Sequence, residues 1–357
     1  MNSEKVTEYR NIKILPVTYP SITSWTWHAN LFAIIQELPE AQDWIYSNYI
    51  QVQCQPDFKE EHLFFEFIPF FKSILDCPVL HNQYIDRKMI RDKWIDMKDF
   101  LVYCIDNDYY IYGICNERYM LNLHQDFYHE LFIYGYDFKE QTFCCADFTF
   151  TGINKYSFSR KPFEQVCQGF VDVTDETDYL LGWEGGFVLS RVYKPKDKYE
   201  IDVNYIKRNI REYLDGFNSN IHFGLVYNKK TLSHHRANGT PLAFHEFGIK
   251  VYDVLITYLC EIKDPAKIDI RPFHNMYEHK KLMTKRIEYL EKKKIINNDV
   301  NNDVYLQIEE KSLVLCNMII KYKLKSSCKA LEQILSKLRE IRLIEEKELT
   351  HLLNCFV

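Results

Sequence analysis

The sequence has no stripe of basic residues, and this absence argues against one large class of function. Its 45 Lys and Arg residues are interspersed with 50 Asp and Glu residues, and the formal net charge is −5. A surface that follows a phosphate backbone needs clustered positive charge. We therefore expect no nucleic acid among the partners of this protein.

Long apolar segments are also missing. The longest runs, such as residues 63–71, are interrupted by an acidic residue and are too short to cross a bilayer as a helix. Residues 1–16 carry acidic and basic side chains and lack the apolar core of a secretory signal. These patterns predict a soluble, cytoplasmic protein with no membrane partner.

Regularly spaced metal or disulfide ligands are lacking as well. The 11 cysteines are odd in number and include no Cys-x-x-Cys pair, which argues against a disulfide framework and a zinc cluster. We expect reduced thiols that pack as small hydrophobes, with Cys144 and Cys145 in a strand. His234, His235 and His245 have no acidic or thiol ligand at a matching helical spacing. We therefore predict a solvated loop there and no metal site.

What the chain does contain is enough apolar material for a sizeable core. Of its 357 residues, 46% are hydrophobic and 15% are aromatic, which is typical of a globular protein with two domains. Helices followed by an antiparallel meander predict the α+β class. We place one domain at residues 1–171 and a mainly α-helical domain at 172–357, with loop-like composition from Asp172 to Gly186.

Hydrophobic periodicity and turn residues predict the individual elements. The apolar stripes of the later helices would serve to cap an active site, to bind a carrier protein or to form a homodimer. The tandem Asn-Asn-Asp-Val repeat at 297–304 predicts a turn between helices. The expected helices are residues 27–38, 83–97, 203–214, 247–259, 276–294 and 327–356, and the expected strands are 100–104, 109–114, 130–136 and 142–148.

One pair of residues, His129 and Asp147, is a candidate for catalysis. His129 opens a predicted strand and Asp147 closes its hairpin partner. If the two strands pair antiparallel, these ends lie side by side, which is the geometry by which a carboxylate orients an imidazole for general-base work. On local evidence alone, a structural histidine and a turn-forming aspartate are the commoner explanation.

The order of elements resembles a known family. An extended segment enters a helix, and a later helix precedes the segment 100–106 and the pattern His-x-x-x-x-x-Gly-Tyr-Asp at 129–137. Further matching segments lie at 247–252, 268–274 and 278–280, so the likeness extends over most of the chain. Together they resemble the papain-like cysteine acyltransferases of the butirosin biosynthesis protein H type, which occur in nonribosomal and thiotemplated gene clusters, including that of closthioamide.

The resemblance implies a papain-like cysteine-protease fold with a Cys-His-Asp triad. It also implies an amide-forming acyltransferase of antibiotic biosynthesis, which moves an acyl group from a carrier-protein thioester to an amine. The expected partners are an acyl or peptidyl carrier protein and an amine substrate. The protein would need no cofactor of its own, since phosphopantetheine is carried by the carrier protein.

The same resemblance places the nucleophile at the start of the first long helix, where helix dipole and backbone N–H groups lower a thiol pKa and bind an oxyanion. No cysteine stands there, and Ala29 occupies the nucleophile position. Thr23 stands about where the fold usually has an oxyanion-hole glutamine, so backbone N–H groups, His28 or Asn30 would have to compensate.

Three explanations of Ala29 stay open. The chain is an engineered Cys-to-Ala variant of the acyltransferase that traps a substrate, or a naturally inactive homologue that binds without reacting, or Ala29 is an ordinary helix residue and the nucleophile lies elsewhere. A papain-type hydrolase is a further functional alternative. The charged run Glu278, His279 and Lys280 is predicted to be an exposed helix face or a capping contact with Arg271.

Overall fold

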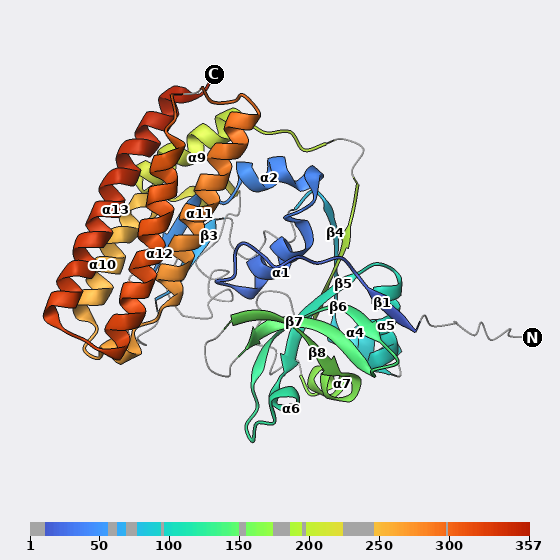
Figure 1. The fold of residues 1–357 in the computed structure, drawn as a ribbon. Helices are drawn as coiled ribbons and strands as arrows, with labels where there is room; N and C mark the ends of the chain where they lie inside the picture. The colour runs from blue at the N-terminus through green and yellow to red at the C-terminus, as the bar shows by residue number, and fades with distance from the viewer. Residues whose placement is uncertain are drawn as a thin grey trace, which may run out of the picture. The chain divides into compact units, whose positions relative to one another are not determined.

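The computed structural model describes residues 11–55, 63–68, 77–93, 96–149, 155–173, 186–194, 198–223, 246–297 and 299–357. The chain forms two compact units that interleave along the sequence. The sheet unit comprises Met1–Pro20, Asn30–Ile35 and Leu75–Pro195, and the helical unit comprises Ser21–Ala29, Gln36–Ile74 and Lys196–Val357. The positions of the units relative to one another are not determined (Figure 1). The domain boundary expected at 171/172 stays a prediction, and most of the loop-like stretch beyond it lies outside the described residues.

The sheet unit is built around an antiparallel sheet in the order β4-β9-β5-β6-β7-β8, with β1 also paired to β6. β1 and β5 share one edge of β6: Ile111 of β5 faces Ile133, and Ile14 of β1 faces Gly135. Gly135 is required there, since a Cβ atom would lie 2.7 Å from the carbonyl oxygen of Lys13. The strands are β1 (Ile12–Ile14), β4 (Leu80–Ile85), β5 (Tyr110–Asn116), β6 (Tyr128–Asp137), β7 (Thr142–Thr149), β8 (Lys155–Pro162) and β9 (Phe187–Val192).

The predicted strand at 100–104 is wrong, because this segment lies inside helix α5 (Met97–Asp106). Asp96 caps the helix by accepting a hydrogen bond from the backbone N–H of Lys98 at 2.7 Å. Within the helix, Phe100, Leu101, Val102, Cys104 and Ile105 are buried, while Tyr103 is exposed. The run is thus the buried face of a helix, and α5 packs on β5, β6 and α7 (Phe163–Val171).

The predicted helix at 83–97 is also wrong in its first part. Residues 83–85 belong to β4, which pairs with β9 from Leu80↔Val192 to Ile85↔Phe187. Only α4 (Arg87–Lys93) follows as a helix. The predicted strands at 109–114, 130–136 and 142–148 are confirmed by β5, β6 and β7.

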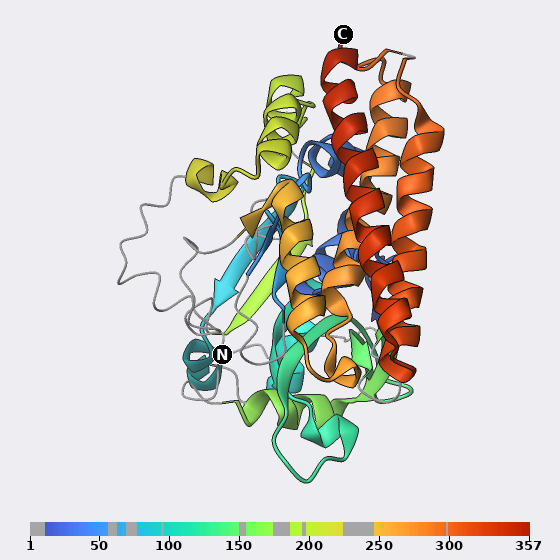
Figure 2. The same cartoon turned by 90° about the vertical axis from the view of Figure 1, so that its left-hand side faces the viewer.

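The helical unit combines a small antiparallel sheet, in the order β10-β2-β3, with a group of long helices (Figure 2). The predicted helices at 203–214 and 327–356 are confirmed, the one at 276–294 begins earlier, at Arg271, and the one at 247–259 begins later, at Val251. The elements are α2 (Gln42–Ser47), β2 (Gln51–Cys54), β3 (Phe65–Ile68), α9 (Val203–Asp215), β10 (Glu246–Phe247), α10 (Val251–Glu261), α11 (Arg271–Lys292), α12 (Asn302–Leu324) and α13 (Cys328–Cys355).

Helix α12 is absent from the predicted set, although the turn before it was predicted. Asn301 ends that turn and caps α12 by accepting a hydrogen bond from the N–H of Asp303. Apolar residues lie on both faces of this helix: Ile308 and Leu315 are buried, whereas Leu313 and Val314 are exposed. With no single apolar stripe, the periodic signal of a surface helix is weak.

Three further findings bear on the class of protein. The mixed α and β content with antiparallel sheets confirms the α+β class. Within the described ranges, no helix is both long and apolar enough to span a membrane. Cys144 and Cys145 are buried as predicted, and all 11 cysteines are free.

Candidate functional site

Helix α1 (Thr26–Ile35) is the element on which the functional prediction depends, and the two units share it. Thr26–Ala29 belong to the helical unit and Asn30–Ile35 to the sheet unit. Seven consecutive residues from Trp27 to Ala33 are at most 6% exposed. The predicted start at residue 27 is confirmed to within one residue, and the helix ends earlier than predicted.

The buried carboxylate of Glu278 accepts hydrogen bonds from the residues just before α1. Glu278 of α11 accepts hydrogen bonds from the N–H of Thr23 at 2.5 Å and from the N–H of Ser24 at 3.0 Å. The Thr23 hydroxyl donates to the same carboxylate at 2.8 Å. A negative charge at a helix N-terminus is stabilised by the helix dipole and the unsatisfied N–H groups. Thr23 is therefore bonded to a carboxylate, which is not the arrangement of an oxyanion donor.

The imidazole of His274 lies beside the same carboxylate. Its Nε2 lies 3.1 Å from Oε1 of Glu278 and 3.0 Å from the Thr23 hydroxyl oxygen. Burial acts to raise the pKa of Glu278, but the hydrogen bond and charge of His274, together with the hydrogen bonds from Ser24 and Thr23, outweigh it, so that this pKa is lowered. Burial acts to lower the pKa of His274, but the hydrogen bond and charge of Glu278 together raise it overall. The geometry favours a charged imidazole–carboxylate pair in front of α1.

Ala29 lies one turn inside α1 and is fully buried. Its backbone N–H donates to the carbonyl oxygen of Trp25 at 2.9 Å. An oxyanion hole needs an N–H group that is not already bonded within the protein. The amide of position 29 therefore cannot serve as an oxyanion donor while this turn of the helix is intact.

His28 is part of a closed network in the helical unit. Its Nε2 lies 2.5 Å from Oε1 of Glu66, and its Nδ1 lies 3.3 Å from the hydroxyl of Tyr49. Glu66 also accepts from the indole N–H of Trp27 at 3.1 Å. His28, Glu66 and Tyr49 are all completely buried. This network anchors α1 on β3 and does not present His28 to a substrate.

Asn30, the last predicted oxyanion or substrate residue, is held in the sheet unit. Its Oδ1 accepts a hydrogen bond from the hydroxyl of Tyr156 on β8 at 2.7 Å. Both side chains are buried, at 1% and 0% exposure. Asn30 thus connects α1 to the sheet.

The predicted pair His129 and Asp147 also lies in the sheet unit, at the ends of β6 and β7. The paired part of these strands stops at Phe132↔Ala146, before either residue. The Asp147 carboxylate lies 2.8 Å from the ammonium of Lys161 on β8. The carboxylate beside the His129 imidazole is that of Glu130, with Nε2 and Oε2 3.3 Å apart. These contacts give Asp147 a different partner from the one predicted for it.

Glu117 lies near these residues, and we call the following five residues the charged cluster: Glu117, His129, Glu130, Asp147 and Lys161. Both carboxyl oxygens of Glu117 are buried, and neither has a hydrogen-bond partner within the described part of the chain. Burial raises the pKa of Glu117 well above its usual range, and the charges of Asp147 and Glu130 add to the rise while Lys161 opposes it. The geometry therefore favours a protonated Glu117.

Sequence reasoning did not identify Glu66, Glu117 or Glu278. For Glu66 a signal was present, because a lone acid within an apolar strand must find a partner when it is buried. The charged run at 278–280 is wrong as an exposed face, since Glu278, His279 and Lys280 are at most 2% exposed. The predicted capping contact with Arg271 is not the one that forms: Glu278 accepts hydrogen bonds from the backbone N–H groups of Thr23 and Ser24, just before α1.

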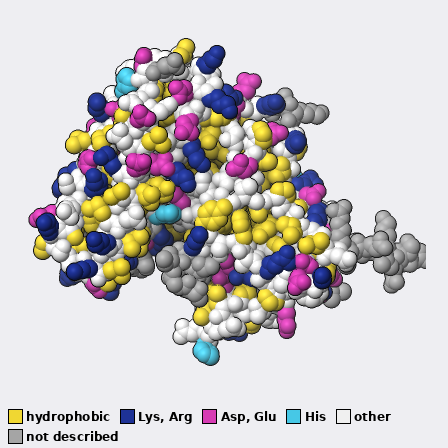
Figure 3. Space-filling view, viewed as in Figure 1, with side chains coloured by type: hydrophobic (Ala, Val, Ile, Leu, Met, Phe, Trp, Pro, Cys, Tyr) yellow, Lys and Arg dark blue, Asp and Glu magenta, His cyan; other side chains and the backbone are white. Residues whose placement is uncertain are grey.

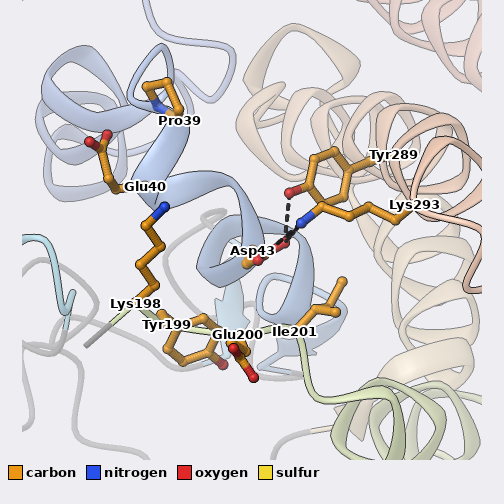
Figure 4. Close-up of a pocket in the computed structure, with 9 residues that line it drawn as sticks. All are labelled: Pro39, Glu40, Asp43, Lys198, Tyr199, Glu200, Ile201, Tyr289 and Lys293. Carbon is orange, nitrogen blue, oxygen red and sulfur yellow. Dashed lines mark hydrogen bonds and ion pairs between the residues drawn. The ribbon is translucent and has the colours of Figure 1, made fainter. Parts of the chain in front are cut away.

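A cavity of about 520 Å³ lies within the helical unit (Figure 4). On one side, Asp43 accepts from the Tyr289 hydroxyl at 2.6 Å and pairs with Lys293 at 3.0 Å. Glu40, Lys198 and Glu200 contribute charges of both signs to the rest of the wall. The balanced lining indicates no single class of ligand.

No group of three or more His, Cys, Asp or Glu side chains in the described ranges could hold a metal ion. The predicted loop at His234, His235 and His245 lies outside those ranges.

No protein-family model matches the chain, and no curated protein matches it. A functional proposal must therefore rest on the residues themselves and on the resemblance described above.

Proposed function

We propose that this chain is an acyltransferase-type protein of thiotemplated nonribosomal peptide biosynthesis that carries alanine where catalysis needs cysteine. In this form it binds a carrier protein bearing an acyl chain and does not transfer the acyl group. The papain-like fold and the amine acceptor are parts of the same proposal, which draws them from the resemblance. The protein acts in the cytoplasm, and the phosphopantetheine is carried by its carrier-protein partner.

The surroundings of position 29 support the proposal that the chain is non-reactive. Position 29 has a methyl group in place of a nucleophile, and it lies in a buried helix turn whose N–H is already bonded to Trp25. The polar residues nominated around it are bonded as well: Thr23 to Glu278 and His28 to Glu66. This supports binding without covalent catalysis.

With cysteine at position 29, the chemistry implied by the resemblance has two steps. His129 accepts the thiol proton, the thiolate attacks the carrier thioester, and His129 returns the proton to the departing phosphopantetheine thiolate, so that a free thiol leaves and an acyl-enzyme thioester forms. An amine then attacks this thioester, His129 accepts its proton, and the cysteine thiol is regenerated as the amide leaves. One thioester replaces another in the first step, so its free-energy cost is small.

The experiment is Ala29→Cys, incubated with acyl-pantetheine thioesters and analysed by intact-protein mass spectrometry. We expect an added acyl mass on A29C, none on the wild-type chain, and at least about 100-fold slower acylation of A29C/H129A, since general bases contribute about 10²–10⁴-fold. Product analysis with and without an amine separates transfer from papain-type hydrolysis. Equal acylation of A29C and A29C/H129A would refute the role of His129.

The second candidate is a scaffold protein that never had a catalytic role. It is favoured by the Asp147–Lys161 ion pair, because the carboxylate expected to orient His129 is bonded elsewhere. An A29C variant that stays unmodified while the wild-type chain still binds holo-carrier protein in a calorimetric titration would support this alternative and refute the acyltransferase proposal.

A further inference from the structure

Helix α12 has an apolar stripe on its outer face that nothing in the described chain covers. It packs against α11 and α13 on one side, and its other side lies at the outside of the helices (Figures 1 and 2). Leu306, Leu313 and Ile320 are 42–43% exposed, Val314 is 49% exposed and Leu324 is 84% exposed. Figure 3 shows hydrophobic side chains interspersed with charged ones over these helices.

The spacing of the stripe is that of a helix-pairing seam. Leu306, Leu313 and Ile320 repeat every seven residues, and Leu324 follows Ile320 by four. Residues at these intervals lie along one line on a helix, and a seven-residue repeat is the pattern of two helices packed side by side. Asn317 is exposed between Leu313 and Ile320.

The charges beside the stripe are arranged in order along the helix. Asp303 and Glu310 lie in its N-terminal half, whereas Lys321 and Lys325 lie at its C-terminal end, and all four are exposed. Two copies of α12 placed antiparallel bring the acidic half of each against the basic end of the other. A parallel pair would place like charges together instead. The face is thus complementary to itself under a twofold axis.

We propose that the exposed face of α12 is a homodimer interface, with two copies of this chain packed antiparallel about an axis near Leu313 and Val314. A helix of 23 residues is about 34 Å long, so the seam alone forms an interface at the small end of the specific range. This inference is independent of the acyltransferase proposal.

The test is analytical ultracentrifugation of the full chain over a concentration series. We expect the wild-type chain to dimerise, and Leu313→Glu to raise the dimer dissociation constant at least tenfold. Leu343→Glu is the matched control, because Leu343 is 67% exposed on α13 outside the stripe and the variant adds the same charge. Thermal melting of each variant checks that the fold is retained.

If Leu313→Glu unfolds the helix, a charge exchange tests the same interface. Glu310→Lys and Lys321→Glu should each weaken the dimer, and the double variant should restore it, since the antiparallel pairing is recovered. A wild-type chain that stays monomeric at every concentration would overturn the proposal. So would a dimer that Leu343→Glu disrupts and Leu313→Glu does not.

Discussion

The buried ion pair between Lys280 and Glu345 offers the sharpest test of the energetics of the helical unit. The ammonium lies 2.6 and 2.8 Å from the two carboxylate oxygens, and both residues are only 2% exposed. Tyr213 and Tyr252 donate their hydroxyls to the same carboxylate at 3.0 and 2.8 Å. Burial lowers the pKa of Lys280, while Glu345 opposes the shift. The pair joins α11 to α13 in the interior.

Replacing Lys280 with Met leaves a buried carboxylate with its countercharge removed. Breaking a buried pair in this way costs about 3–5 kcal/mol, which is a large part of the about 5–15 kcal/mol stability of a typical domain. Replacing both members, in Lys280→Met with Glu345→Met, removes the stranded charge. It leaves two tyrosine hydroxyls without their acceptor, at a cost of about 1–3 kcal/mol each. We expect the double variant to be at least as stable as K280M, because removing the stranded charge offsets the hydroxyl cost.

The assay is urea unfolding followed by far-UV circular dichroism, which reports the helices. The control is Asp253→Ala, which breaks the exposed pair of Arg342 with Asp253, where the carboxylate is 60% exposed. Exposed pairs contribute at most about 1 kcal/mol. The reasoning fails if K280M loses no more stability than D253A, or if the double variant is less stable than K280M.

Two further predictions concern carboxyl groups with shifted pKa values. Glu117→Gln should become more stable than the wild-type chain as pH rises: the raised pKa of Glu117 gives stability that is complete below about 4.5 and lost above it. Unfolding at pH 5 and pH 8 should show a difference that grows by at least about 1.4 kcal/mol, the equivalent of one pKa unit, and a constant difference would refute the protonated Glu117. Glu278→Gln should lose about 1–3 kcal/mol at pH 7, because the lowered pKa of Glu278 gives stability that is present above its ordinary value and lost as pH falls. The loss should shrink as pH falls below about 4.5 in the same assay, and a loss independent of pH would contradict the charged Glu278.

The sequence predicted best the elements whose periodicity is simple. Strands β5, β6 and β7 lie in the sheet where alternation and turn residues placed them, and α9 and α13 follow clear helical stripes. The strand predicted at 100–104 was wrong because the run of apolar and aromatic residues in the segment 97–106 fits a buried strand as well as a buried helix face. The cap formed by Asp96 resolves that ambiguity. Helix α12 was missed because apolar residues on two faces leave no single stripe.

The candidate site was harder to predict because its chemistry depends on contacts between residues far apart in the chain. The Thr23–Glu278 hydrogen bond joins residues 255 positions apart, and the Lys280–Glu345 pair joins residues 65 apart. Sequence patterns identify polar residues, but they do not assign them to partners. His129 and Asp147 show the consequence: alternation correctly placed both on strands, yet the nearest opposite charges are those of Glu130 and Lys161.

The hydrogen bonds of the residues around α1 also bear on function. An oxyanion donor must keep an N–H or O–H group for the substrate, whereas Thr23 and His28 are each bonded to a carboxylate of their own unit. Buried carboxylates require such partners, since an unpaired buried charge costs several kcal/mol. Two of the residues predicted as oxyanion or substrate residues, Thr23 and His28, therefore stabilise Glu278 and Glu66. A reactive form of this protein would need at least one of these carboxylates to exchange its partner when substrate binds.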